Sequence, residues 1–255
     1  MTAPIESYAL IGDCETAALV GRDGSIDWLC WPRFDSQACL AALLGDEQNG
    51  RWRLAPTGTY QVSRSYRRDS LVLETSFECD GGVVSVIDFM PVRDGASDLV
   101  RIVIGRKGEV NLRSDLALRF DYGNVVPWVE RAADDTLRAV AGPHKILLRS
   151  SQPHHGEALT TVSEFKLAAG QVASFTLTYA PSHLPDPPAR DPQAALTSTQ
   201  EFWQRWSSRC CYEGAWRDGV VRSLITLKAM TYAPTGGLCA APTTSLPEHL
   251  GGQRN

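Results

Sequence analysis

The chain has 255 residues, of which 43% are hydrophobic and 21% charged, and this composition excludes disordered, collagen-like and coiled-coil proteins. Its net charge of −4 and its scattered arginines predict no nucleic-acid partner. No apolar run is long enough to cross a membrane and the seven cysteines form no C-x-x-C pair, so we expect a cytoplasmic protein with reduced thiols, no membrane partner, no metal and no cofactor.

The first fifty residues contain a predicted hairpin and a predicted short helix. In "AALVGRDGSIDWLCW", two apolar runs flank a turn in which Gly24 can take a positive φ. The next stretch, "FDSQACLAALLGD", is rich in Ala and Leu. We expect it to form a helix that is capped by Asp35 or Ser36 and ends at Gly45.

Between about residues 50 and 180 the hydrophobic pattern has a period of two. In "VNLRSDLALRF", for example, the leucines alternate with Arg113, Asp115 and Arg119, which we expect on the outer face. Turn signals separate the runs, among them "RKGE" at 106–109. The pattern predicts a mainly β fold, an antiparallel two-sheet sandwich with these side chains inside: Leu71, Leu73, Phe77, Leu112, Leu116, Leu118, Phe175 and Leu177.

A proline-rich stretch, "APSHLPDPPARDP", ends the sandwich and is followed by two amphipathic segments. In the second segment Val220, Leu224, Leu227 and Met230 lie three or four residues apart and form an apolar stripe. Two helices do not make a domain. We therefore expect the stripe to need cover from the sandwich, from the preceding helix or from a second copy of the chain, which predicts self-association.

Two long motifs carry a resemblance to a known family. "IGDCETAALVGRDGSIDWLCWPRFDSQACLAALLGD" at 11–46 and "VVRSLITLKAMTYAPTGGLCAAPTTSLPEHLGGQRN" at 220–255 resemble the bacterial branch of glycoside hydrolase family 15, the glucoamylase and trehalase-like enzymes. The resemblance implies an N-terminal β-supersandwich domain over 1–180, a Pro-rich and helical linker over 181–212, and the incomplete start of an (α/α)6 barrel over 213–255.

The resemblance also implies an activity. Members of the family hydrolyse α-glucosidic bonds in an oligosaccharide or disaccharide of glucose with inversion, using one carboxylic acid and one carboxylate. The family's catalytic glutamates lie beyond the segment that "GGQRN" resembles, so we expect no catalytic residue on this chain and no activity by itself. The alternative is a stand-alone carbohydrate-binding or interaction module, which should not leave an apolar stripe uncovered.

Five residues are candidates for substrate binding. Glu248, in a loop that the resemblance places near the barrel pocket, is either an acid at the pocket or the cap of a turn. Arg254 is a candidate for lining the sugar subsite. In "WPRFDS", Trp31, Arg33 and Asp35 combine a stacking face with a donor and an acceptor for sugar hydroxyls, although an Arg33–Asp35 contact that only fixes the loop is equally open.

The glycine-rich tail is expected to be mobile. Residues 233–255 include Gly236, Gly237, Gly251 and Gly252, which make the backbone easy to disorder when no barrel lies against it.

Overall fold

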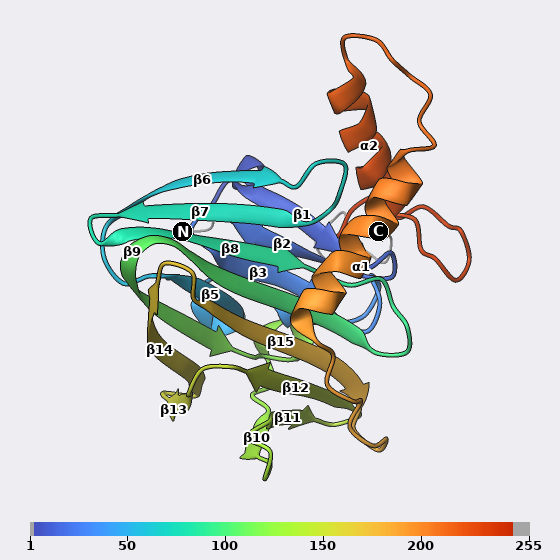
Figure 1. Ribbon diagram of the computed structural model, residues 1–255. Coiled ribbons are helices and arrows are strands. Elements are labelled where there is room, and N and C mark those ends of the chain that lie inside the picture. The colour runs from blue at the N-terminus through green and yellow to red at the C-terminus, as the bar shows by residue number, and fades with distance from the viewer. Residues whose placement is uncertain (1–2, 247–255) are drawn as a thin grey trace.

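The computed structural model describes residues 3–246. Within this range the chain forms fifteen strands and two α-helices (Figure 1), which are β1 (Tyr8–Gly12), β2 (Ala17–Gly21), β3 (Ser25–Cys30), β4 (Ala38–Leu40), β5 (Arg51–Pro56), β6 (Tyr60–Tyr66), β7 (Leu73–Cys79), β8 (Gly82–Phe89), β9 (Ser97–Ala117), β10 (Trp128–Arg131), β11 (Leu137–Ala141), β12 (His144–Ser150), β13 (His155–Glu157), β14 (Thr160–Ala168), β15 (Val172–Pro181), α1 (Pro192–Ser207) and α2 (Arg217–Ala229).

The strands form two antiparallel sheets that share the long strand β9. The N-terminal half of β9 pairs with β8 and β15, and its C-terminal half pairs with β5 and β14. The first sheet therefore contains β1 to β5, β13 and β14, and the second contains β6 to β8, β10 to β12 and β15. The predicted mainly β, antiparallel supersandwich is confirmed.

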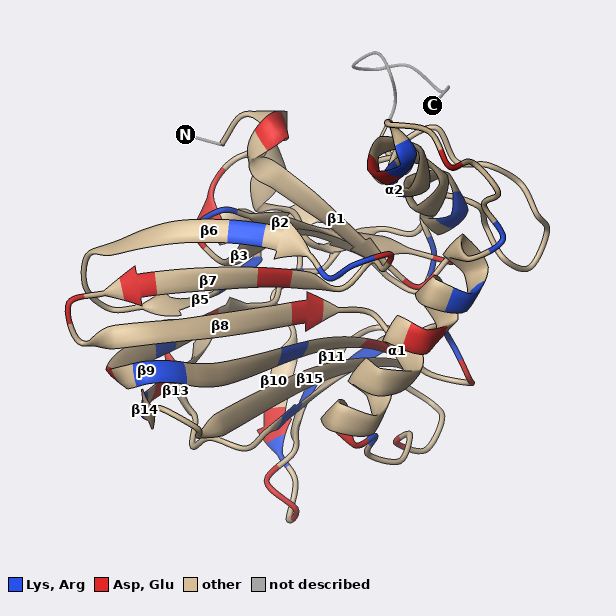
Figure 2. Cartoon of the chain, turned by 45° about the horizontal axis from the view of Figure 1, so that its top comes forward, with Lys and Arg blue, Asp and Glu red and all other residues tan. Residues whose placement is uncertain are grey.

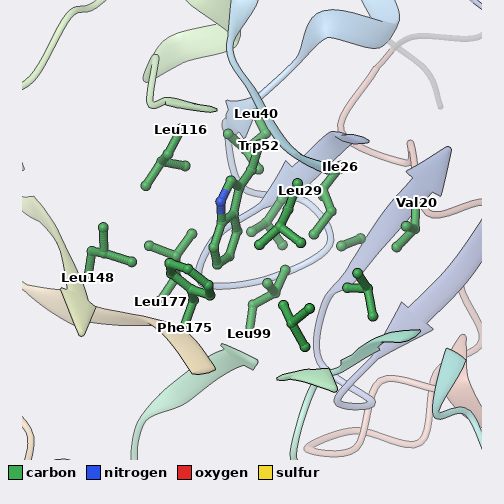
Figure 3. Packing of buried hydrophobic residues seen from close by; sticks show 14 of the residues in the cluster. Val20, Ile26, Leu29, Leu40, Trp52, Leu99, Leu116, Leu148, Phe175 and Leu177 are labelled. Carbon is green, nitrogen blue, oxygen red and sulfur yellow. The ribbon is translucent and has the colours of Figure 1, made fainter. Parts of the chain in front are cut away.

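The core lies between the two sheets. Figure 3 shows Trp52 from the first sheet facing Phe175 and Leu177 from the second, with the Trp52 and Phe175 rings 6.4 Å apart in an edge-on contact. The eight side chains expected inside are all buried, at 8% exposure or less; seven lie in the core between the sheets, whereas Leu71 lies in the cluster that α2 covers. The period-two pattern therefore identified the register of these strands correctly.

Two local predictions are wrong. The expected turn at 106–109 does not form, because β9 runs through it with a bulge and Gly108 takes the positive φ of 62° that the irregularity requires. The expected helix at 34–46 is instead β4 followed by a single 3-10 turn. Ala38, Cys39 and Leu40 are buried on every side, so the run of apolar residues reflects complete burial and not a helical face.

Helix α1 covers part of the outer face of the second sheet, and α2 packs beside it on α1 and on the end of the sandwich. α1 begins at Asp191, whose carboxylate accepts a hydrogen bond from the Ala194 amide at 2.7 Å, and packs Ala195 and Leu196 on β8 and β9. α2 buries Val221, Ile225 and Ala229 against Trp203 of α1 and against Leu71 and Cys14 of the sandwich. No helix in the described range is long and apolar enough to span a membrane.

The buried face of α2 differs from the predicted stripe. Of the four stripe residues only Met230 is buried, whereas Val220 and Leu224 are half-buried and Leu227 is 51% exposed. The stripe therefore lies beside the face that packs on the sandwich. The expected cover from the sandwich and from the preceding helix is present, but it reaches a neighbouring set of side chains.

Candidate functional site

The loop of residues 31–36, which carries three of the predicted binding residues, is fixed to the sandwich by Trp31. The Trp31 indole is 3% exposed, donates from Nε1 to Ser97 Oγ at 2.9 Å and lies 6.2 Å from the Tyr179 ring. The next residue follows through a cis peptide bond to Pro32. The structure thus places Trp31 in the scaffold beneath the loop, with no open face for stacking on a sugar.

Arg93 joins this loop to the turn that precedes β2. Its guanidinium, 14% exposed, donates to Asp13 Oδ2 at 2.7 Å, to Glu15 Oε2 at 3.1 Å and to the Pro32 carbonyl. Ser97 Oγ also donates to Asp13 Oδ2, at 2.7 Å. Three segments that are distant in the sequence therefore meet at one almost buried guanidinium, and charge-assisted hydrogen bonds of this kind are the stronger ones.

Arg33 and Asp35 stand at the surface of the loop and bind each other. Arg33 Nε and Nη2 each donate to a carboxylate oxygen of Asp35 at 2.9 Å, and both side chains are more than half exposed. The hydrogen bonds from Arg33 to Asp35 raise the pKa of the guanidinium, with a smaller contribution from Tyr232. The pair fixes the loop and at the same time presents a donor and an acceptor toward solvent.

A segment that returns from α2, residues 231–246, lies across the first sheet next to this loop. Ala233 N donates to the Cys14 carbonyl at 2.8 Å, and Trp28 Nε1 donates to the Pro242 carbonyl at 2.9 Å. Leu246 packs in the cluster around Trp28. These contacts hold the described part of the tail, residues 233–246, against the sandwich, which argues against the mobility expected there, and residues 247–255 lie outside the described residues.

The other two predicted site residues, Glu248 and Arg254, lie outside the described residues. The chain that leads to them passes along β3, where Ser245 lies 3.4 Å from the Cys30 sulfur and accepts at its carbonyl from the Tyr122 hydroxyl at 3.4 Å. The structure consequently brings the loop 31–36 and the approach to Glu248 to the same side of the sandwich. The binding role of all five residues stays a prediction.

A hollow of about 640 Å³ opens beside the loop, under the proline-rich segment. Pro32 and Arg93 form part of its wall, and Arg190 donates to Asp98 at 3.1 Å across another part. Its mixture of apolar surface, arginines and carboxylates suits a ligand with hydroxyl groups. Within residues 3–246 no three His, Cys, Asp or Glu side chains are grouped as a metal site would require, and His155 contacts only Glu157 as an acidic partner.

Local sequence rules explain Asp13 only in part and give no signal for Arg93. Asp13 accepts from the Glu15 and Thr16 amides at 2.9 and 2.8 Å, as aspartate side chains in turns commonly do. Its second oxygen binds an arginine 80 residues away, and no local pattern signals that contact. The period-two hydrophobic pattern between about residues 50 and 180 identifies strands, but it does not show which loops the fold brings together.

Comparisons of the sequence with known proteins agree on one family. A family model described as "Trehalase-like, N-terminal" matches residues 1–165. The trehalase of Mycolicibacterium smegmatis is 32% identical over 281 residues, covering 99% of this chain and 42% of that protein. The trehalase of Thermoplasma volcanium is 29% identical over 258 residues, covering 98% of this chain and 41% of that protein.

A solved structure of a bacterial glucoamylase, in complex with acarbose, shares the fold. It superposes with a TM-score of 0.62 at 10% identity, over 90% of this chain and 41% of that chain. The chain therefore spans about two fifths of the length of the trehalases and of the glucoamylase that it matches. The family model covers more than half of the chain and agrees with the supersandwich, and the chain belongs to the trehalase-like N-terminal family.

Proposed function

We propose that this chain is the sandwich part of a glycoside hydrolase that cleaves α-glucosidic bonds in a disaccharide or oligosaccharide of glucose, of trehalase or glucoamylase type. The observation that carries the proposal is the match of residues 1–165 to the trehalase-like N-terminal family, together with trehalases that align over almost the whole chain. The reaction we propose is inverting, so that water attacks the anomeric carbon from the face opposite the departing sugar oxygen.

In this proposal residues 1–180 form the sandwich domain, residues 181–212 link it, and residues 213–255 begin the catalytic unit. The chain by itself is inactive, because it carries neither the acid nor the base. The loop 31–36 supplies Arg33 and Asp35 at the edge of the substrate pocket, where the bidentate pair can exchange one internal hydrogen bond for a sugar hydroxyl. The cysteines in residues 3–246 are free of disulfides, which supports a place in the reducing cytoplasm.

The test is to express the chain alone and as part of its complete gene product, and to measure glucose release from trehalose and maltose. We expect activity only from the complete product. Proton NMR of the first turnovers then distinguishes the mechanisms, since inversion at one anomeric carbon of trehalose yields one α- and one β-glucose. Two α-glucose molecules would contradict inversion, and glucose release by the purified 255-residue chain would contradict the assignment of roles.

One observation favours a second candidate, carbohydrate binding by the sandwich itself. Trp128, 77% exposed, borders a hollow of about 440 Å³ between β10 and the β13–β14 hairpin, together with Glu157, Thr160 and Thr161. An exposed indole beside hydroxyl and carboxylate groups is a suitable surface for a sugar ring. Retarded migration of the chain in a glycogen-containing native gel, abolished by Trp128→Ala and kept by Trp216→Ala, would support this candidate.

A further inference from the structure

Two arginines are buried in the described part of the chain, and only one of them has a carboxylate partner. Arg101, 0% exposed, binds Asp88 with Nε at 2.8 Å and Nη2 at 3.3 Å. It also donates to the carbonyls of Trp52 at 2.9 Å and Gly24 at 2.7 Å. Each of its three nitrogens therefore has an acceptor, and its charge is compensated inside the protein.

Arg119 is almost as deeply buried, at 5% exposure, but it has no such compensation. Its Nη1 donates to the carbonyls of Leu118 at 2.8 Å and Leu159 at 3.1 Å, and no carboxylate in residues 3–246 forms an ion pair with it. Burial lowers the pKa of the guanidinium, and no neighbouring charge opposes that effect. The alternating pattern had placed Arg119 on the solvated face, where it would need no partner.

Arg119 lines a hollow and has two nitrogens without a protein acceptor in residues 3–246. Nε and Nη2 donate to no atom in the described residues, and neither is among the polar atoms there that are sealed from solvent. Arg119 lines a hollow of about 350 Å³ between β5, β9 and the start of β14. The contact of Arg119 with the β13–β14 turn, in which Leu159 has a φ of 61°, uses Nη1 alone, so this structural role does not involve the Nε and Nη2 donors.

The other arginines of the hollow are already neutralised. Arg51 pairs with Glu47, and Arg113 pairs with Asp115 at 2.8 Å and Glu164 at 2.7 Å. All residues that line this hollow are described, and among their guanidinium groups only that of Arg119 has no carboxylate partner. In Figure 2 basic and acidic residues are interspersed along the strands.

We propose that Arg119 is the anchor of a binding site for one small oxyanion, a phosphate or a carboxylate group. The Nε and Nη2 hydrogens form a planar fork that matches two oxygens of such a group, and the ligand's charge supplies the compensation that Arg101 obtains from Asp88. Gln48 and Thr160 line the same hollow and offer further donors, and the hollow's carboxylates are engaged by its other two arginines, Glu47 by Arg51 and both Asp115 and Glu157 by Arg113. A neutral sugar would fill the hydrogen bonds but leave the charge uncompensated. The inference goes beyond the proposed hydrolase activity and does not depend on it.

The site is tested by titrating the 255-residue chain with inorganic phosphate and, separately, with acetate in a low-salt amine buffer, by isothermal calorimetry. We expect one saturable site for at least one of the two anions. Arg119→Met should weaken binding by at least about tenfold, because it removes two charge-assisted hydrogen bonds. The matched control Arg131→Met removes a surface arginine that is paired with Asp135 and should leave binding unchanged.

Two further measurements separate binding from folding, since Arg119→Met also removes the contacts to Leu159. In the folded wild-type chain, the ¹⁵N NMR signal of Arg119 Nε should shift on anion addition with the same affinity as calorimetry reports. Thr160→Glu should abolish binding in a folded protein, because it adds to the wall of the hollow a carboxylate that has no arginine partner there other than Arg119. The proposal is overturned if neither anion binds, if the Arg119 Nε signal does not move, or if folded Arg119→Met or Thr160→Glu binds as the wild type does.

Discussion

The Arg101–Asp88 pair has no contact with solvent, and this makes each partner dependent on the other. Arg101→Met leaves a buried carboxylate without a counter-charge, so we expect the free energy of unfolding to fall by about 3–5 kcal/mol. Urea denaturation followed by tryptophan fluorescence measures the change. The control Arg106→Met, whose side chain is 42% exposed and paired with Glu74, should cost less than about 1 kcal/mol. Equal losses in the two variants would show that burial does not set the cost.

Three buried thiols should be unreactive while the chain is folded. Burial raises the pKa of Cys14 to about 11 and that of Cys30 to about 12, and it raises the pKa of Cys39 as well. At pH 8 we expect iodoacetamide to label the exposed Cys211 and to spare these three until urea is added, as peptide mass spectrometry would detect. Labelling of Cys30 in the native protein would contradict its burial.

The same thiols predict how stability depends on pH. The folded chain keeps these protons at a pH where the unfolded chain, with thiol pKa values of about 8.5, has lost them. The contribution of these buried thiols to stability is complete below the thiol pKa of the unfolded chain. It is lost as the pH rises toward the thiol pKa values of the folded chain. The thermal midpoint should therefore decline above about pH 8.5.

Individual residues also mark the limit of what the sequence predicts. Asp13 in its turn follows from local hydrogen-bonding rules, since its partners are two and three residues away. Arg93 and Arg119 do not, because their partners come from other strands and loops and their burial depends on the whole sandwich. Arg33 and Asp35 stand out by their motif, and the structure shows the contact between them that the sequence left open, while their role in binding stays a prediction.

At the scale of the element, α2 shows that apolar spacing identifies a helix better than it identifies the buried face. Ile225 is fully buried against α1 and the sandwich, and Leu227 is half exposed. Ile225→Ala should lower the free energy of unfolding by about 2–5 kcal/mol, because it leaves a cavity. Leu227→Ala is the control and should change it by less than about 1 kcal/mol in thermal unfolding experiments. A larger loss of stability for Leu227→Ala than for Ile225→Ala would instead support the buried stripe predicted from the sequence.

The loop 31–36 depends on Arg93 in a way that hydrogen exchange can measure. Arg93→Met removes the donors to Asp13, Glu15 and the Pro32 carbonyl, and it leaves Asp13 buried without its cation. We expect faster deuterium uptake in the peptide that contains residues 31–36, with unchanged uptake in β11 and β12. Unchanged exchange in the loop would show that Trp31 and Ser97 hold it without Arg93.

Most of the elements were predictable because a half-buried strand repeats every two residues, and the hairpin around Gly24 was predictable because its turn requires a positive φ, observed at 78°. The stretch 34–46 was not, since residues buried on every side give no periodicity. β9 was not either, because a strand that passes between two sheets contains Gly105 and Gly108 where a turn would also place glycine.

For the whole molecule, the exposed apolar residues around α2 predict self-association. Trp216 is 77% exposed, Leu238 61% and Leu227 51%, and all three belong to the region that follows the sandwich. We expect the mass measured by light scattering to rise with protein concentration, and the double change Trp216→Ser and Leu238→Ser to suppress the rise. Trp128→Ser, at the opposite end of the sandwich, is the control. A concentration-independent monomer would contradict the prediction.

The shared strand β9 also determines the order in which the two sheets can form during synthesis. Its partners β5 and β8 precede it in the chain, whereas β14 and β15 follow it, the last ending at Pro181. On a translating ribosome, strand pairs such as β7–β8 can form early, but the first sheet cannot close around β9 until residue 168 has left the exit tunnel, and the second sheet not until residue 181 has left it. Until then, β9 in the nascent chain has unpaired edges that could pair with other chains. A chaperone that binds the nascent chain would therefore prevent aggregation mainly during this interval.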